Sequence, residues 1–180
     1  MRLRLSSQAI NTLIDHATDG YEIEYKREVG GHLLGFKDRY GFYVSKVEPY
    51  NTTSKKRTWW GPNLRLFGER GRELETGRLK WIGVYHSHVE EKGKASTKQS
   101  GEDKVIHKFS TRPIEIVVRV ANFRMRTPKD CLSFDEYYDK YDEESEYFSY
   151  DEKGYSYDIC GYVIDSRGKI KRVKVVTAQR

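Results

Sequence analysis

The apolar run at residues 79–88, LKWIGVYHSH, ends in two histidines and constrains the fold of this chain more than any other segment. Its length and apolar character predict a buried strand. A helix is predicted over 100–109, SGEDKVIHKF, where Ser100 suits the N-cap and acidic residues follow in the first turn. A second strand is predicted over 113–121, PIEIVVRVA. The middle of the chain is therefore predicted as strand, helix, strand.

The flanking segments supply further elements. We expect a helix over 6–18 capped by Ser6 or Ser7, a second helix over about 62–76, and two hairpins, one from strands 29–36 and 41–50 and one over 157–176 around DSRG. Helices and strands interleave around a mainly antiparallel pattern. That pattern favours an α/β (α+β) chain folded as an α-β-α sandwich with a mixed central sheet. The length of 180 residues predicts a single domain over 1–180.

Charge is distributed unevenly along the chain. Residues 126–158 carry 4 basic and 11 acidic side chains, a local net of −7, which leaves +13 for the rest of a chain whose total is +6. We interpret the acidic, tyrosine-rich segment 126–156 as an insertion within the domain, which could cover a groove, bind a basic partner or be a solvated loop. The basic remainder could attract nucleic acid or an acidic protein, but no nucleic-acid-binding signature supports the former beyond charge.

The sequence also predicts a location. No apolar run approaches the roughly 20 residues of a membrane helix, and the first residues lack the apolar core of a signal peptide. Cys131 and Cys160 do not form a CxxC pair, and we interpret them as two thiols of a reducing compartment rather than a disulfide. These features predict a cytoplasmic protein without a membrane partner.

The two histidines carry the candidate chemistry. His86 and His88 are two residues apart on a strand, so their imidazoles share a face and could form half of a tetrahedral zinc site. A third ligand should be a carboxylate or another nitrogen, and the residues that follow offer Gln99, Asp103 and His107. Two such histidines on their own are a weak signal. We expect His107 to be a solvated helix residue that could compete as a ligand.

The other two histidines have expected structural roles. His32 lies in the glycine-rich strand and is predicted to be packed, and His16 is predicted near a helix end.

Three segments, EVGGHLLG (28–35), HSH (86–88) and SGED (100–103), together resemble the JAMM motif of the MPN+ metallopeptidases, which include zinc deubiquitinases and their archaeal and bacterial relatives. The resemblance spans most of the chain except roughly 126–156, and it implies the cytidine-deaminase-like sandwich of that family. It also implies a role for each matching residue: zinc ligation by His86, His88 and Asp103, proton transfer by Glu28, and oxyanion stabilisation by Ser100.

The spacing departs from the family pattern. In most relatives the serine follows the second histidine by eight residues and the aspartate by three more, which here gives Ser96 and Gln99. An amide oxygen is a poor zinc ligand, so that register would describe a damaged site. A loop four residues longer restores the carboxylate through Ser100 and Asp103, and we favour it. It also predicts Ile106 and Phe109 on one helix face.

The resemblance implies a substrate class as well. It indicates hydrolysis of a peptide or isopeptide bond, often after the C-terminal Gly-Gly of a ubiquitin-like protein, and a sulfur-carrier protein is an alternative. In the loop SKKRTWWGPN, Trp59 and Trp60 could form a partner surface, or one could be core. The rival functions are a catalytically silent MPN scaffold and a nucleic-acid-associated protein. Loss of the carboxylate in the strict register would favour the scaffold, and an intact Glu28 and ligand set opposes it.

Overall fold

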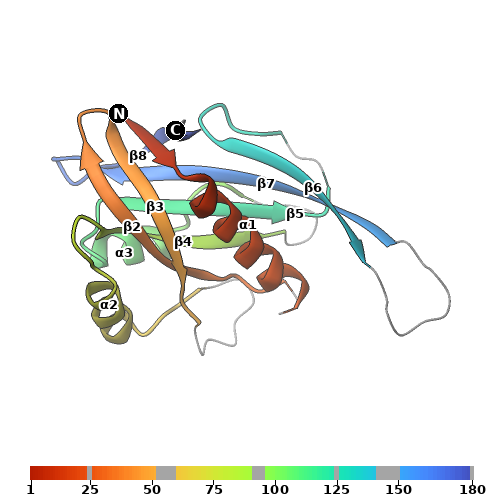
Figure 1. Ribbon diagram of the computed structural model, residues 1–180, viewed down its shortest axis with the longest axis horizontal. Coiled ribbons are helices and arrows are strands. Elements are labelled where there is room, and N and C mark those ends of the chain that lie inside the picture. Colours follow the sequence, from red (N-terminus) through yellow and green to blue (C-terminus); the bar gives the residue numbers. More distant parts are fainter. Residues whose placement is uncertain (24–25, 52–59, 91–95, 124–125, 141–150, 179–180) are drawn as a thin grey trace.

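The computed structural model of the chain describes residues 1–23, 26–51, 60–90, 96–123, 126–140 and 151–178 (Figure 1). Its elements in chain order are β1 (Arg2–Leu5), α1 (Ser7–Glu22), β2 (Gly30–Asp38), β3 (Gly41–Pro49), α2 (Leu64–Glu73), β4 (Lys80–Val89), α3 (Gly101–Phe109), β5 (Ile114–Ala121), β6 (Leu132–Lys140), β7 (Asp151–Ile164) and β8 (Ile170–Thr177).

Hydrogen bonding closes the sheet into a barrel. The strand order is β5-β4-β2-β3-β1-β8-β7-β6, and β7 also pairs antiparallel with β5. Seven strands, all but β6, therefore form a closed ring. An α-β-α sandwich requires an open sheet between two helical layers, so the sandwich predicted from the sequence is wrong. The pairing that closes the ring sets Val117 opposite Cys160, a long-range register that local patterns do not encode.

Two apolar clusters position the helices. The first fills the barrel with strand residues and the inward stripe of α1, namely Ile10, Leu13, Ile14 and Ala17. The second lies on the other side of β2 and β4 and joins Trp60 and Trp81 to Phe67 of α2, with Ile106 of α3 packed against it. The helix predicted at the N-terminus is confirmed, with Ser6 as its N-cap.

The connection from β4 to β5 sets the geometry of the candidate site. These strands pair in parallel, with His86 opposite Val117, and α3 forms the crossover between them. The carboxyl end of β4 and the N-terminus of α3 therefore lie at the same end of the pair. That is where the two histidines and the SGED segment belong.

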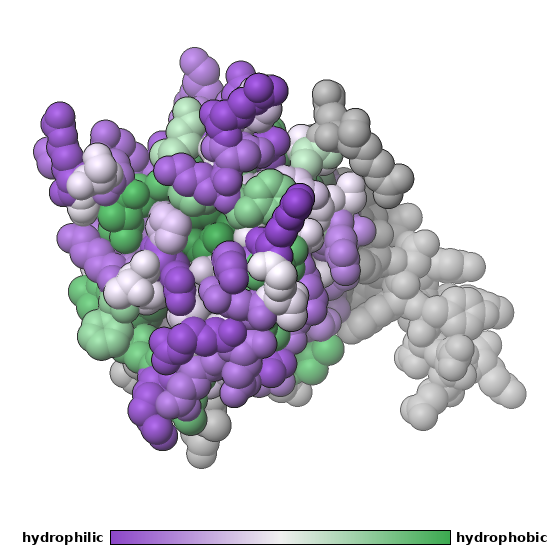
Figure 2. All heavy atoms as spheres, turned by 60° about the vertical axis from the view of Figure 1, so that its left-hand side comes forward, coloured by the Kyte–Doolittle hydropathy of each residue, from purple (hydrophilic) through white to green (hydrophobic). Residues whose placement is uncertain are grey.

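Some large apolar side chains of the described residues are exposed, among them Phe36, Leu66 and Phe109. The side of the molecule at the left of Figure 1 is turned forward in Figure 2, where hydrophilic residues dominate and hydrophobic ones are scattered. Phe109 of α3 is 65% exposed, whereas Ile106, three residues earlier, packs against the second cluster.

None of the helices in the described ranges is long and apolar enough to cross a membrane.

The acidic segment contributes a hairpin. Strand β6 pairs antiparallel with the first part of β7, and the two strands extend beyond the barrel in Figure 1. Residues 141–150 of the predicted insertion lie outside the described residues. The insertion at 126–156 stays a prediction.

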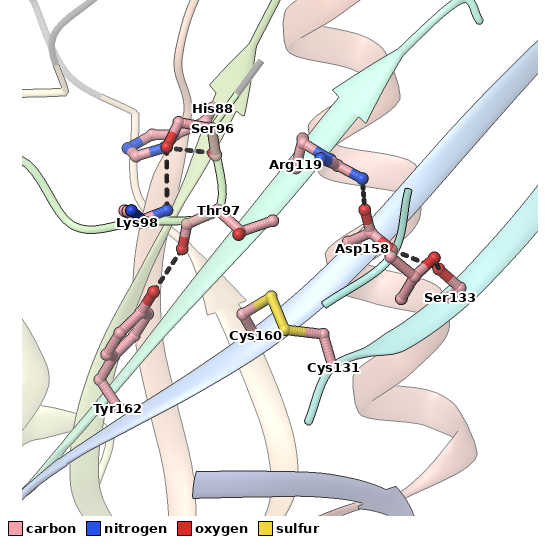
Figure 3. The surroundings of a disulfide bond; sticks show 11 residues. His88, Ser96, Thr97, Lys98, Arg119, Cys131, Ser133, Asp158, Cys160 and Tyr162 are labelled. Atoms are coloured by element: carbon pink, nitrogen blue, oxygen red, sulfur yellow. Dashed lines mark hydrogen bonds and ion pairs between the residues drawn. A yellow bond between two sulfur atoms is a disulfide. The ribbon is translucent and has the colours of Figure 1, made fainter. Parts of the chain in front are cut away.

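The two cysteines form a disulfide, so the prediction of two free thiols is wrong. The β6–β7 register pairs Leu132 with Ile159, which sets Cys131 directly opposite Cys160 (Figure 3). Their separation of 29 residues in sequence gave no sign of this, because the hairpin register determines which residues oppose one another.

Removing this cross-link should destabilise the fold. We expect replacement of both cysteines by alanine to lower the free energy of unfolding by about 2–4 kcal/mol, because the unfolded chain regains the entropy of an open loop. Urea denaturation followed by circular dichroism measures this change. Wild-type protein unfolded with a reducing thiol serves as the control and should match the variant. Equal urea midpoints for oxidised and reduced protein would contradict the prediction.

Candidate metal centre

Three side chains from two elements converge at the carboxyl end of β4. The Nε2 atoms of His86 and His88 lie 2.9 Å apart. The Asp103 carboxylate of α3 places one oxygen 3.4 Å from His86 Nε2 and the other 3.3 Å from His88 Nε2. His86 and Asp103 are buried, and His88 is half-buried. These are the three described residues whose ligand atoms group tightly enough to hold a metal ion.

The spacing of these atoms fits a tetrahedral zinc ion. Zinc binds histidine nitrogen and carboxylate oxygen at about 2.0–2.2 Å, so two ligands of a regular tetrahedron are about 3.3 Å apart. The nitrogen–oxygen distances of 3.3 and 3.4 Å match that edge, and the nitrogen pair at 2.9 Å is slightly shorter. Two imidazoles and one carboxylate are also a donor set of catalytic zinc sites, which keep a fourth position open.

Asp103 is fixed by the N-terminus of α3. Its backbone N–H donates to Ser100 Oγ at 3.1 Å, and the Ser100 N–H donates to Asp103 Oδ2 at 2.5 Å, which completes a capping box. Burial opposes ionisation of Asp103, but hydrogen bonds to His86 and His88 outweigh it and hold the pKa of the carboxyl well below its usual value. The carboxylate is therefore ionised and ready to bind a cation.

Ser100 serves that cap as an acceptor. Accepting from Asp103 leaves its hydroxyl hydrogen uncommitted by the cap, and Ser100 is exposed. The predicted role as a donor to an oxyanion remains a prediction.

Backbone groups orient His88. Its Nδ1 lies 2.8 Å from the Ser96 carbonyl oxygen, which can only accept, so Nδ1 carries the hydrogen and Nε2 keeps its lone pair for the cluster. The neighbouring Thr97 carbonyl accepts a hydrogen bond from the hydroxyl of Tyr162 on β7 (Figure 3). Strand β7 therefore helps to hold the segment that fixes the His88 ring.

His86 lies between two carboxylates. Its Nε2 faces Asp103 and its Nδ1 lies 3.3 Å from Glu115 Oε1 of β5. Burial alone would lower the pKa of His86, but hydrogen bonds to Asp103 and Glu115 and their charges raise it to about 10. Without a metal this imidazole is therefore protonated at neutral pH, and binding a metal at Nε2 must displace a proton.

Glu28 lies in the segment that leads into β2, beside this cluster. Burial raises the pKa of its carboxyl, while the charges of His88 and His86 act in the opposite direction. The backbone N–H of Trp60 donates a hydrogen bond to it. A carboxylate with a raised pKa next to a metal site is suited to accept and return a proton near neutrality.

Ser87 ties Glu28 to the histidines. It points to the opposite face of β4 from His86 and His88 and is fully buried. The Val29 N–H donates to Ser87 Oγ at 2.9 Å, and the Ser87 N–H donates to the Val29 carbonyl at 2.7 Å. The residue after Glu28 is therefore held by two hydrogen bonds to the residue between the two ligands.

Trp60 covers the cluster. Its ring lies parallel to that of His86, with centroids 6.5 Å apart, and it is 3% exposed, so it is a core residue. A Cβ at Gly30 would come within 2.6 Å of the Trp60 ring, so glycine allows this approach. Trp59 lies outside the described residues.

The alternative register has a different geometry. The side-chain amide of Gln99 lies 3.2 Å from His107 Nδ1, and Ser96 takes part through its carbonyl and its contact with Lys98. The structure brings the Asp103 carboxylate to the histidine pair and turns Gln99 toward His107.

The remaining histidines correct or confirm earlier expectations. His107 is fully buried and burial lowers its pKa to about 4, so the prediction of a solvated residue is wrong. His16 lies inside α1 rather than near its end, where its Nδ1 is 2.7 Å from the Tyr85 hydroxyl. His32 is buried and stacked on Phe67, as predicted.

Sequence reasoning missed Glu115, Trp60 and Ser87 as parts of the site. Glu115 had a visible signal, since it is the one acidic residue in the apolar run PIEIVVRVA. A carboxylate in a buried strand needs a polar partner, which should have pointed to a nearby site. Ser87 and Trp60 had no such signal, because their contacts depend on the pairing of β2 with β4.

Comparison with known proteins gives a likeness of fold. No protein-family profile matches the chain, and no curated protein matches it. The solution structure of protein DSY2949 from Desulfitobacterium hafniense is similar, with a TM-score of 0.58 and 14% sequence identity, and the match covers 100% of this chain and 94% of that one. At this identity the similarity concerns the fold alone.

Proposed function

We propose that this chain is a zinc-dependent peptidase or isopeptidase of the JAMM type. The observation that carries the proposal is the convergence of His86, His88 and Asp103 at distances that match the edges of a zinc tetrahedron. Its second support is the motif in which Glu28, HSH and SGED occur in the order of that family.

The side chains have separate roles in the proposed hydrolysis: metal binding, proton transfer and stabilisation of the oxyanion. Zinc held by the three ligands would supply Lewis-acid activation of the carbonyl and of a water molecule. Glu28 takes a proton from the attacking water and delivers it to the leaving amine, as its raised pKa allows. Ser100 donates its hydroxyl hydrogen to the oxyanion of the tetrahedral intermediate.

The substrate class rests on the resemblance. A bond after the C-terminal tail of a ubiquitin-like or sulfur-carrier protein is proposed because such a tail is extended and could add as a strand beside the site. The location that we propose is the cytoplasm. The Cys131–Cys160 disulfide opposes that location, since a reducing compartment disfavours disulfides.

Zinc content tests the proposal. We expect about one zinc per purified chain in the wild type and almost none in His88→Ala, because two ligands rarely retain a catalytic metal. Hydrolysis of ubiquitin-like conjugates should be lost in the same variant. Elemental analysis and a gel-based cleavage assay measure the two effects.

His16→Ala is the matched control, because it removes an imidazole on α1 outside the cluster. It should keep its zinc. If the wild-type protein takes up no zinc, even when metal is supplied, the proposed zinc peptidase is refuted. The catalytically silent MPN scaffold would then be favoured.

A further inference from the structure

A second carboxylate lies behind the cluster. Glu115 of β5 is 1% exposed, within a strand whose other residues are mainly apolar. Its Oε1 is 3.3 Å from His86 Nδ1, and its Oε2 is 3.4 Å from His107 Nδ1. Among the described residues neither oxygen has a partner at hydrogen-bond geometry, so these two contacts are at close ion-pair distances. One buried carboxylate is thus shared by two imidazoles.

A buried carboxylate with a purely structural role would lower the stability of the folded protein. A buried carboxylate destabilises a protein unless it is paired, and an apolar residue of similar size would often be as stable. Glu115 instead faces the ring nitrogen of His86 that is not directed at the cluster. Carboxylates in that position fix the ring orientation of metal-binding histidines and increase their basicity.

We propose that Glu115 is a positioning residue for the metal centre, which it serves by accepting the Nδ1–H of His86. This inference rests on the proposed function, since it concerns the same ligand. With Nδ1–H held by Glu115, the Nε2 lone pair of His86 points toward His88 and Asp103. Glu115 does not itself join the ligand set.

His107 holds the other oxygen of Glu115. It is fully buried and neutral at physiological pH, so it can donate one hydrogen from Nδ1. The side-chain oxygen of Gln99 has no partner in its assigned orientation, and turning the amide over would let that oxygen accept from His107 too. The Nδ1 hydrogen would then lie between Glu115 Oε2 and the Gln99 oxygen.

Helix α3 is therefore attached to the centre twice. Asp103 and His107 are four residues apart and lie on the same face of the helix. Asp103 reaches the histidines directly, and His107 reaches His86 through Glu115. His107, which the sequence analysis considered as a competing ligand, thus contacts Glu115, which in turn contacts the ligand His86.

Two substitutions at Glu115 test the proposal. Glu115→Gln keeps the shape and a weaker acceptor, and Glu115→Leu removes the acceptor. We expect zinc affinity, measured by competition with a chelator, to fall about 10-fold in the first and about 100-fold in the second. Crystal structures of the metal-free proteins should show the His86 ring in place in the wild type and turned away in Glu115→Leu.

Asp158→Asn is the matched control. Asp158 is a carboxylate of similar burial on the neighbouring strand β7, where it contacts Arg119 and Ser133 and none of the ligands. This control should lose stability and keep its zinc affinity. An equal loss of zinc affinity in Asp158→Asn, or unchanged affinity and an unmoved His86 ring in Glu115→Leu, would overturn the proposal. Wild-type protein without zinc would refute the proposed function instead, and the metal-free structures would still decide whether Glu115 orients His86.

Discussion

Asp103→Ala should release the metal, whereas Gln99→Ala should retain it. The Asp103 carboxylate supplies an oxygen to each histidine of the cluster, so alanine leaves two nitrogens and no anionic ligand. We expect zinc content to fall from about one per chain to almost none in Asp103→Ala. Elemental analysis of the purified variants measures it, and hydrolysis of a conjugate should disappear with the metal.

Gln99→Ala is the informative partner in this comparison. Gln99 is buried and contacts His107, so its loss should cost stability without emptying the site. Thermal unfolding of both metal-free variants separates misfolding from loss of a ligand. The opposite result, with zinc lost from Gln99→Ala and kept by Asp103→Ala, would show that the strict spacing of the family applies here.

Glu28→Gln should keep the metal and lose the reaction. Glutamine preserves the side-chain shape and can still accept the hydrogen bond from the Trp60 backbone, but it cannot take a proton from water. Proton transfer by a positioned side chain contributes about 10²–10⁴-fold, so we expect kcat to fall by about that factor. Zinc content and kcat for a model conjugate are measured on the same preparation.

Glu48→Gln provides the control for this substitution. Glu48 is a carboxylate of β3 that pairs with Lys46 and Arg70 away from the cluster. It should keep both zinc and turnover. Full activity in Glu28→Gln would exclude Glu28 as the general base, and loss of zinc in that variant would indicate a structural role.

The sequence predicted local structure better than the architecture. Apolar spacing and the caps at Ser6 and Ser100 are local signals, and both helices begin where these residues indicate. The closure of the barrel depends on β7 pairing with β5, and the disulfide depends on the β6–β7 register. Neither register follows from periodicity, because a strand shows which face is buried but not which strand lies beside it.

The candidate site, too, could be predicted from the sequence only in part. The ligand candidates His86, His88 and Asp103 could be found from their type and spacing. Glu115 was missed although its acidic side chain stands in an apolar run, and His107 was considered but expected at the surface. The position of His107 comes from tertiary packing, because α3 turns it inward toward β5.

The crossover from β4 to α3 has a consequence for how this molecule could be modified. Pairing of β4 with β5 fixes His88, while the capping box and the His107–Glu115 contact independently fix the helix that carries Asp103. Ser96 contacts His88, and Thr97 accepts from Tyr162, so these two residues belong to the anchored part. The length of chain between Val89 and Ser96 need not determine the geometry of the cluster, and each doubling of that length would cost only about 0.6 kcal/mol. Four residues more than the family pattern are thus easily accommodated. A reporter peptide or an added recognition element is therefore best inserted ahead of Ser96, where the contact of Ser96 with His88 is kept.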